Sequence, residues 1–115
     1  MNENAAAWRL DVDRQKDRTV LRVTGDLDLE TAPHLLAEAD PFLTATGGLV
    51  VDLSRLSFID SSGLSALIRL HRGMAGTGRL FEIISPVPTV AKAFEITGLD
   101  QVLPLRAPVP GPAPG

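Results

Sequence analysis

Hydrophobic and polar positions recur along the chain with two periods, and these periods mark out strands and helices. Residues 8–13 alternate between apolar and polar, and residues 19–24 are rich in β-branched and apolar side chains, so both segments are predicted strands joined by a charged turn. A nearly unbroken apolar run at 49–53 predicts a buried strand, and residues 79–84 predict another. Elsewhere apolar residues recur every three or four positions, which predicts helices.

Turn and cap residues set the limits of these elements. Acidic and hydroxyl residues before Pro33 begin the first helix, and a second opens at Asp60 after a connection at 54–58. A third is predicted after Ser85 and Pro86, with Gly98 just past its end, and residues 102–105 predict a short last strand.

The resulting order predicts an α/β fold. We expect a mixed four- to five-stranded sheet, mostly parallel, with an antiparallel hairpin at one edge and helices packed on it. Functional loops of such sheets gather at the carboxyl ends of the parallel strands. The segments 26–31 and 54–63 are therefore expected to meet there.

Length and composition limit the function classes. The chain has 115 residues, no cysteine and a net charge of −3, with 4% aromatic residues. It is long enough for one domain, predicted at 5–106, and the proline- and glycine-rich residues 107–115 are predicted to be a flexible tail. Disulfides and thiol chemistry are excluded, and an acidic chain with few aromatic residues is not expected to bind nucleic acid.

Hydropathy and the first residues suggest a location. No apolar stretch approaches the roughly 20 residues of a membrane span, and the first residues lack a signal-peptide pattern, so we expect a cytoplasmic protein without membrane insertion. The two histidines, His34 and His71, are far apart and lack ligand spacing. We therefore expect neither a metal nor a cofactor.

Residues 58–64 (FIDSSGL) place two hydroxyls and a carboxylate at a predicted helix start. In the structural interpretation, Asp60 or a serine caps the helix and Gly63 permits a tight bend. In the functional interpretation, one serine is modified: a phosphate adds roughly −1.5 to −2 charge, which a helix N-terminus tolerates and a docked partner does not. The residues alone leave both interpretations open.

Catalytic alternatives find little support. The order D-S-S-G differs from the G-x-S-x-G of hydrolase nucleophiles, and His71 lies about 15 Å along the helix from Ser61 at ~1.5 Å per residue. The glycine-rich residues 73–79 lack the Lys-Ser/Thr of a phosphate-binding loop, so a turn is predicted there. We therefore predict that the protein is not an enzyme.

Several segments together carry a family resemblance: residues 25–28 (GDLD), 51–53 (VDL), Leu56, 58–64, Ser85-Pro86, Phe94 and 97–99 (TGL). From about Trp8 to Leu105 the chain resembles the STAS domain family, most closely its single-domain anti-sigma factor antagonists. The resemblance implies partner switching, in which the unphosphorylated antagonist binds an anti-sigma factor that is also a serine kinase and so frees a sigma factor. It assigns phosphorylation to Ser61 and partner binding to Asp28, Asp60, Ser62, Gly63 and Leu64.

The resemblance leaves alternatives within the fold. Other members are a subunit of a membrane lipid transporter or a scaffold module of a stress-sensing complex, and these need no kinase switch. Leu64 is an apolar anchor only if its side chain is exposed, since a buried core position is the default for leucine. Asp26 stands where family members often have Glu, and we expect a monomer or a weak dimer.

Overall fold

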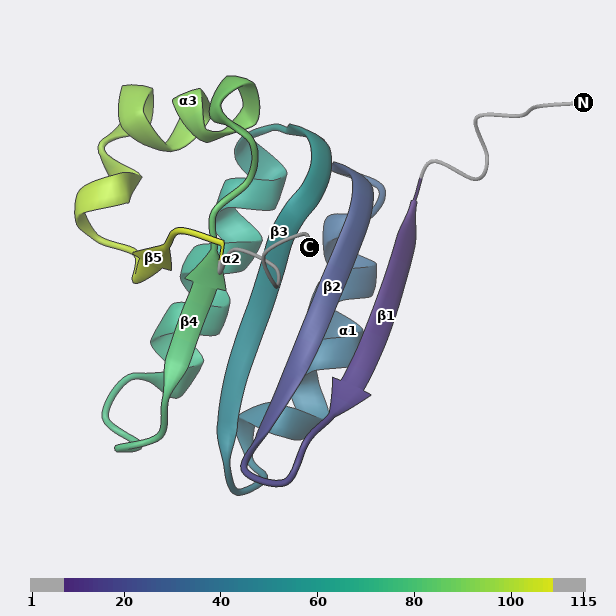
Figure 1. The fold of residues 1–115 in the computed structure, drawn as a ribbon, viewed down its shortest axis with the longest axis vertical. Coiled ribbons are helices and arrows are strands. Elements are labelled where there is room, and N and C mark those ends of the chain that lie inside the picture. Colours follow the sequence, from purple (N-terminus) through teal and green to yellow (C-terminus); the bar gives the residue numbers. More distant parts are fainter. Residues whose placement is uncertain (1–7, 109–115) are drawn as a thin grey trace, which may run out of the picture.

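The computed structural model describes residues 8–108, which form one five-stranded sheet with three α-helices (Figure 1). The elements are β1 (Arg9–Arg14), β2 (Arg18–Leu27), α1 (Ala32–Leu43), β3 (Gly48–Ile59), α2 (Ser61–Met74), β4 (Phe81–Ile84), α3 (Pro88–Thr97), the 3-10 helix η2 (Leu99–Gln101) and β5 (Leu105–Arg106). The predicted α/β fold class is confirmed. Residues 5–7 of the predicted domain and 109–115 of the predicted tail lie outside the described residues.

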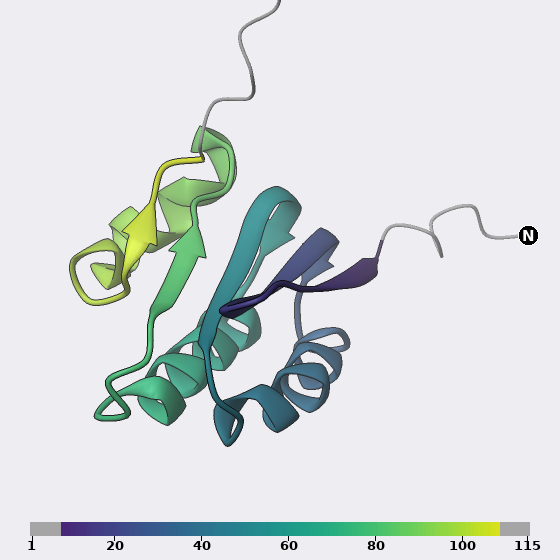
Figure 2. The same cartoon turned by 60° about the horizontal axis from the view of Figure 1, so that its bottom comes forward.

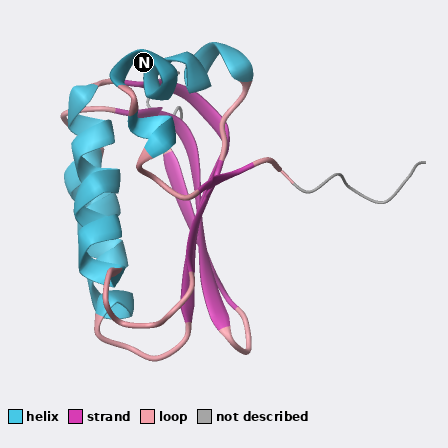
Figure 3. Ribbon diagram, turned by 90° about the vertical axis from the view of Figure 1, so that its left-hand side faces the viewer, coloured by secondary structure: helices cyan, strands magenta, loops and turns pink. Residues whose placement is uncertain are grey.

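The sheet has the strand order β1-β2-β3-β4-β5. β1 and β2 form the antiparallel edge hairpin, and every other neighbouring pair is parallel. Helices α1 and α2 pack side by side on one face of the sheet (Figures 2 and 3). Because parallel strands point the same way, the carboxyl ends of β2, β3 and β4 lie at one end of the sheet, the upper end in Figure 1.

Strand β3 is longer than the sequence pattern predicts, since residues 54–58 continue the strand instead of forming a connection. Ser54 is half-buried and Arg55 is exposed, while Leu56 and Ile59 remain buried. The pairing with β2 shifts register twice in this stretch, so burial does not alternate as in a regular strand. A strand without this alternation resembles a loop in sequence.

Helix α3 begins later than predicted, because Val87 and not Ser85 or Pro86 is its N-cap. The backbone of Val87 is extended, because the following Pro88 disfavours the helical conformation of the residue before it. Pro88 then occupies the first turn, where its missing N–H costs no hydrogen bond. The predicted end is confirmed: Gly98 has a left-handed backbone with φ of 77°.

The core lies between the sheet and helices α1 and α2, and it includes Val90 and Phe94 of α3. Val23, Val51 and Ile83 from three adjacent strands are completely buried. Helix α2 turns Leu67 and Leu70 inward at helical spacing, while its first residue faces solvent. Packing thus fixes the body of α2 and leaves its N-terminus at the surface.

The opposite end of the molecule is closed by Arg79, which follows the glycine-rich turn after α2. Its guanidinium donates to the carbonyl oxygens of Gly47 (2.8 Å), Leu43 (2.9 Å) and Phe42. These include carbonyls from the last turn of α1, which have no partner within the helix. Arg79 therefore joins the end of α1 to the start of β4.

Candidate functional site

The candidate site is the turn from β3 into α2, where Asp60 is the N-cap of the helix. Its Oδ1 atom accepts hydrogen bonds from the backbone N–H groups of Ser62 (2.8 Å) and Gly63 (3.2 Å). The first N–H groups of a helix lack partners within the helix, and this carboxylate satisfies two of them. The predicted cap is therefore formed by Asp60, whose carboxylate is already engaged.

Ser61 is the first residue of α2, and it is exposed. Among the hydrogen bonds of residues 8–108, none uses its hydroxyl. The neighbouring Ser62 is half-buried, and its backbone N–H donates to the Asp60 carboxylate. Because Asp60 performs the capping, the Ser61 hydroxyl has no structural role in the helix start. It is therefore open to an enzyme from outside.

Gly63 and Leu64 face the interior instead. A Cβ atom on Gly63 would lie 2.5 Å from the carbonyl oxygen of Leu27 and 2.7 Å from Cγ1 of Ile59. Gly63 is thus required by close packing against β2, and not by the tight bend expected from the sequence, because its φ is not positive. Leu64 is only 7% exposed and packs in the core, so it offers a partner no free apolar side chain.

The facing loop after β2 is closed by its own hydrogen bonds. Oδ1 of Asp28 accepts from the backbone N–H groups of Glu30 (3.0 Å) and Thr31 (3.1 Å). The Thr31 hydroxyl accepts from the N–H of Asp28 and donates to the carbonyl of Asp26, each at 2.8 Å. Asp28 therefore shapes this loop through its side chain.

The two segments are joined to each other, as the sequence predicts. The backbone N–H of Asp60 donates to the carbonyl oxygen of Leu27 (3.2 Å), and Leu27 pairs in register with Ile59. The loop of residues 28–31 and the start of α2 are therefore one connected surface at the carboxyl end of the sheet. The part of the expected 54–63 loop before Asp60 belongs to β3.

Two apolar side chains beside the site are exposed, and the pattern of the sequence did not mark them. Leu29 lies in the loop after β2 and is 74% exposed, and Phe58 lies near the end of β3 and is 50% exposed. The available signal for Leu29 was its place between two acidic residues, outside any strand or helix period. Large exposed side chains of this kind are candidates for contact with another protein.

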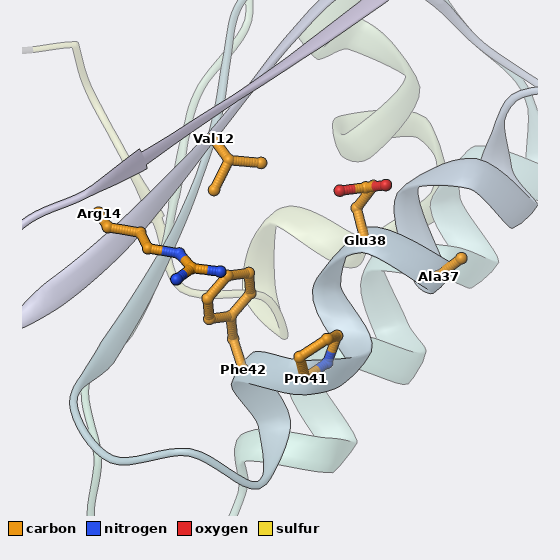
Figure 4. A pocket seen from close by; sticks show the side chains of 6 residues that line it. All are labelled: Val12, Arg14, Ala37, Glu38, Pro41 and Phe42. Atoms are coloured by element: carbon orange, nitrogen blue, oxygen red, sulfur yellow. The ribbon is translucent and has the colours of Figure 1, made fainter.

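A hollow of about 600 Å³ lies far from Ser61, between β1 and the end of α1 (Figure 4). Val12, Pro41 and Phe42 line it, and the guanidinium of Arg14 lies over the Phe42 ring at 5.3 Å. A cation over an aromatic face is a common packing arrangement. The hollow shares no lining residue with the site around Ser61.

The alternatives from enzyme chemistry gain no support from the geometry. His71 lies in the last turn of α2 and stacks on Phe81, with ring centroids 6.0 Å apart, so it belongs to the end of the helix away from Ser61. Within residues 8–108, no group of three or more His, Asp or Glu residues could hold a metal ion. No helix in the same range has the length and apolar character to cross a membrane.

Comparisons with known proteins agree with the fold. The anti-sigma F factor antagonist of Lysinibacillus sphaericus is 28% identical over 86 residues, covering 73% of this chain and 74% of the relative. The crystal structure of an anti-sigma factor antagonist from Mycobacterium paratuberculosis is 28% identical with a TM-score of 0.79, covering 89% of this chain and 86% of that one. The phosphorylated form of the Bacillus cell fate determinant SpoIIAA is 25% identical with a TM-score of 0.67, covering 90% and 92%.

The family comparison covers most of the chain. A family model described as "Mlab, STAS domain" matches residues 10–106. This range includes β2 to β5, all of β1 except Arg9, the joined surface and Ser61. The chain therefore belongs to the STAS domain family.

Proposed function

We propose that this protein is an anti-sigma factor antagonist that regulates transcription by partner switching. Unphosphorylated, it binds an anti-sigma factor that is also a serine kinase, and phosphorylation of Ser61 releases it. The main support is the exposed Ser61 hydroxyl on a helix start that Asp60 caps without it. Relatives over most of the chain carry the name of antagonists, and one similar structure is a phosphorylated form.

Phosphorylation at Ser61 is compatible with the fold. A phosphate adds roughly −1.5 to −2 charge and three acceptor oxygens at the positive end of the α2 dipole. Because Ser61 is exposed and contributes no hydrogen bond to the cap, the modification displaces nothing in the core. Its effect falls on a docked partner, which would have to accommodate and desolvate the phosphate.

The residues assigned to partner binding divide into two groups in this proposal. Ser62 and Asp60 are the neighbours of Ser61 in sequence, and their exposed parts would contact the partner. The other three residues support the surface indirectly. Asp28 closes the loop, Gly63 packs against β2, and Leu64 packs in the core. The protein acts in the cytoplasm without a cofactor or catalysis of its own, and it binds protein and not nucleic acid. Its oligomeric state remains the predicted monomer or weak dimer.

The test is phosphorylation by a kinase-type anti-sigma factor from the same genome, sought first among the products of neighbouring genes, with ATP and mass spectrometry. We expect one phosphate on Ser61, none on the Ser61→Ala variant, and normal labelling of Ser65→Ala, which changes an exposed serine one turn later on α2. Ser61→Ala should retain partner binding and Ser61→Asp should weaken it. Labelling of another residue would refute the assignment of Ser61.

The alternative roles, a lipid-transporter subunit or a stress-complex scaffold, predict a different outcome. In those roles the protein would bind its partners without phosphate transfer, and Ser61→Asp would leave its binding unchanged. Failure of a neighbouring anti-sigma factor to bind the unmodified protein, with transporter subunits binding instead, would favour the first of them.

A further inference from the structure

Leu29 is the most exposed large apolar side chain at the joined surface. It is 74% exposed, although it lies only two residues after Leu27, which is fully buried. A leucine in a mobile loop could turn inward, but the hydrogen bonds of Asp28 and Thr31 fix this loop. Leu29 is therefore held outward by a closed loop.

The surroundings of Leu29 are acidic. The loop and the strand end before it (residues 26–31) and the start of α2 with the residues before it (58–64) contain Asp26, Asp28, Glu30 and Asp60 and no basic residue. Among these, the Asp60 and Asp28 carboxylates already accept hydrogen bonds from the backbone. An apolar projection inside an acidic rim is complementary to an apolar pocket bordered by basic residues.

We infer that Leu29 is the apolar anchor by which this protein docks into its anti-sigma factor, and that Asp28 is the positioning residue that holds Leu29 outward. This inference rests on the proposed function, and it identifies a side chain other than Ser61 that the partner binds. The partner presents an apolar pocket with a basic border. Phosphate on Ser61 then opposes docking through its bulk next to the apolar pocket and through the cost of desolvating it there.

The first experiment measures the affinity of the anti-sigma factor that phosphorylates Ser61, by titration calorimetry. Leu29→Ala should weaken binding roughly tenfold or more, because burial of a leucine side chain in a pocket is lost. Leu80→Ala is the matched control, since Leu80 is also exposed but precedes β4 at the opposite end of the sheet. Both variants should unfold at nearly the wild-type temperature. Wild-type affinity of Leu29→Ala would overturn the inference.

The second experiment separates positioning from direct contact by Asp28. Asp28→Asn retains an acceptor oxygen for the Glu30 and Thr31 N–H groups and should bind nearly as well as wild type, whereas Asp28→Ala should lose several-fold in affinity. In a Leu29→Ala background, Asp28→Ala should cause little further loss, because Asp28 acts through Leu29. If Asp28→Asn is as weak as Asp28→Ala, the charge contacts the partner and the positioning role is wrong.

Phosphate transfer and salt give two further readouts. Leu29→Ala should raise the KM of the kinase for this protein and leave kcat unchanged, because the anchor lies outside the reacting atoms. Wild-type affinity should fall as salt rises, and affinity that rises with salt would exclude a basic border. Failure of any anti-sigma factor to bind or to label Ser61 would refute the proposed function, whereas normal labelling with an unaffected Leu29→Ala would refute this inference alone.

Discussion

At both ends of the sheet, side chains form hydrogen bonds to the backbone, but the results differ. At the carboxyl end, the short side chains of Asp28 and Asp60 bond to nearby backbone, and Ser61 and Leu29 are left exposed. At the other end, the long side chain of Arg79, which precedes β4, reaches the end of α1 and donates hydrogen bonds to three carbonyl groups. Local capping therefore leaves side chains exposed at the surface, whereas the long-range hydrogen bonds of Arg79 join distant parts of the fold.

Among the substitutions at the two ends of the sheet, Gly63→Ala is expected to lower stability the most. The new methyl group would overlap the backbone of β2 at Leu27, and overpacking of this kind should lower the free energy of unfolding by about 2–3 kcal/mol. Urea denaturation measures the change. The control is Gly73→Ala in the same helix, where the methyl group meets only the end of the Leu43 side chain and should change stability far less. Equal effects would show that the contact with β2 is not what requires glycine.

Arg79→Ala tests the closing function of the opposite end. Loss of a charged donor to three carbonyls should cost about 1.5–2 kcal/mol of stability, and Arg79→Lys should recover only part because an ammonium group lacks the planar fork. Urea denaturation again gives the values, with Arg69→Ala as an exposed control. Ser61 phosphorylation should remain normal in folded Arg79→Ala protein, and a loss there would break the proposed separation of the two ends.

Asp60→Ala removes the local cap and should destabilise the protein by about 1 kcal/mol. Asp60→Asn retains an oxygen acceptor and should lie close to wild type. Thermal unfolding distinguishes the two variants. An Asn variant as unstable as the Ala variant would indicate that the charge near the helix N-terminus, and not the hydrogen bond, is the main contribution.

Ser61→Ala should have the smallest effect, within about 0.5 kcal/mol of wild-type stability, since an exposed hydroxyl without partners is removed. The same unfolding measurement tests this prediction. A loss above 1 kcal/mol would mean that the hydroxyl supports the helix start, and the sharp contrast between Asp60 and Ser61 would no longer hold.

Much of the fold follows from local sequence signals. The alternation of β1, the apolar run in β3, the helical spacing of α2 and Gly98 at the end of α3 all act within a few residues, and the structure agrees with each. The extension of β3 through residues 54–58 was missed because this stretch is mostly polar and its register shifts remove the alternation expected of a strand. Arg79 could not be assigned a role, since its partners lie 32–37 residues away in sequence.

The candidate site was predictable in its chemistry but not in its exposure. Residue types alone predicted that Asp60 or a serine caps the helix, and the structure shows that the cap is Asp60. Whether Leu64 or Leu29 faces solvent depends on how α2 packs against β2 and on how the loop of residues 28–31 closes. Those are tertiary properties. Leu64 is buried, which is the default for leucine, whereas Leu29 lies outside any strand or helix period and its exposure could not be predicted.

The close approach of Gly63 to the carbonyl of Leu27 has a consequence for how such switches diversify. The frame that presents Ser61 is held by backbone contacts and one carboxylate, whereas the features that would select a partner under our proposal lie on outward side chains a few positions away. A duplicated gene can change residues 29 and 30 and acquire a different kinase while the frame beneath stays intact. Parallel signalling lines can thus be insulated from one another by very few substitutions.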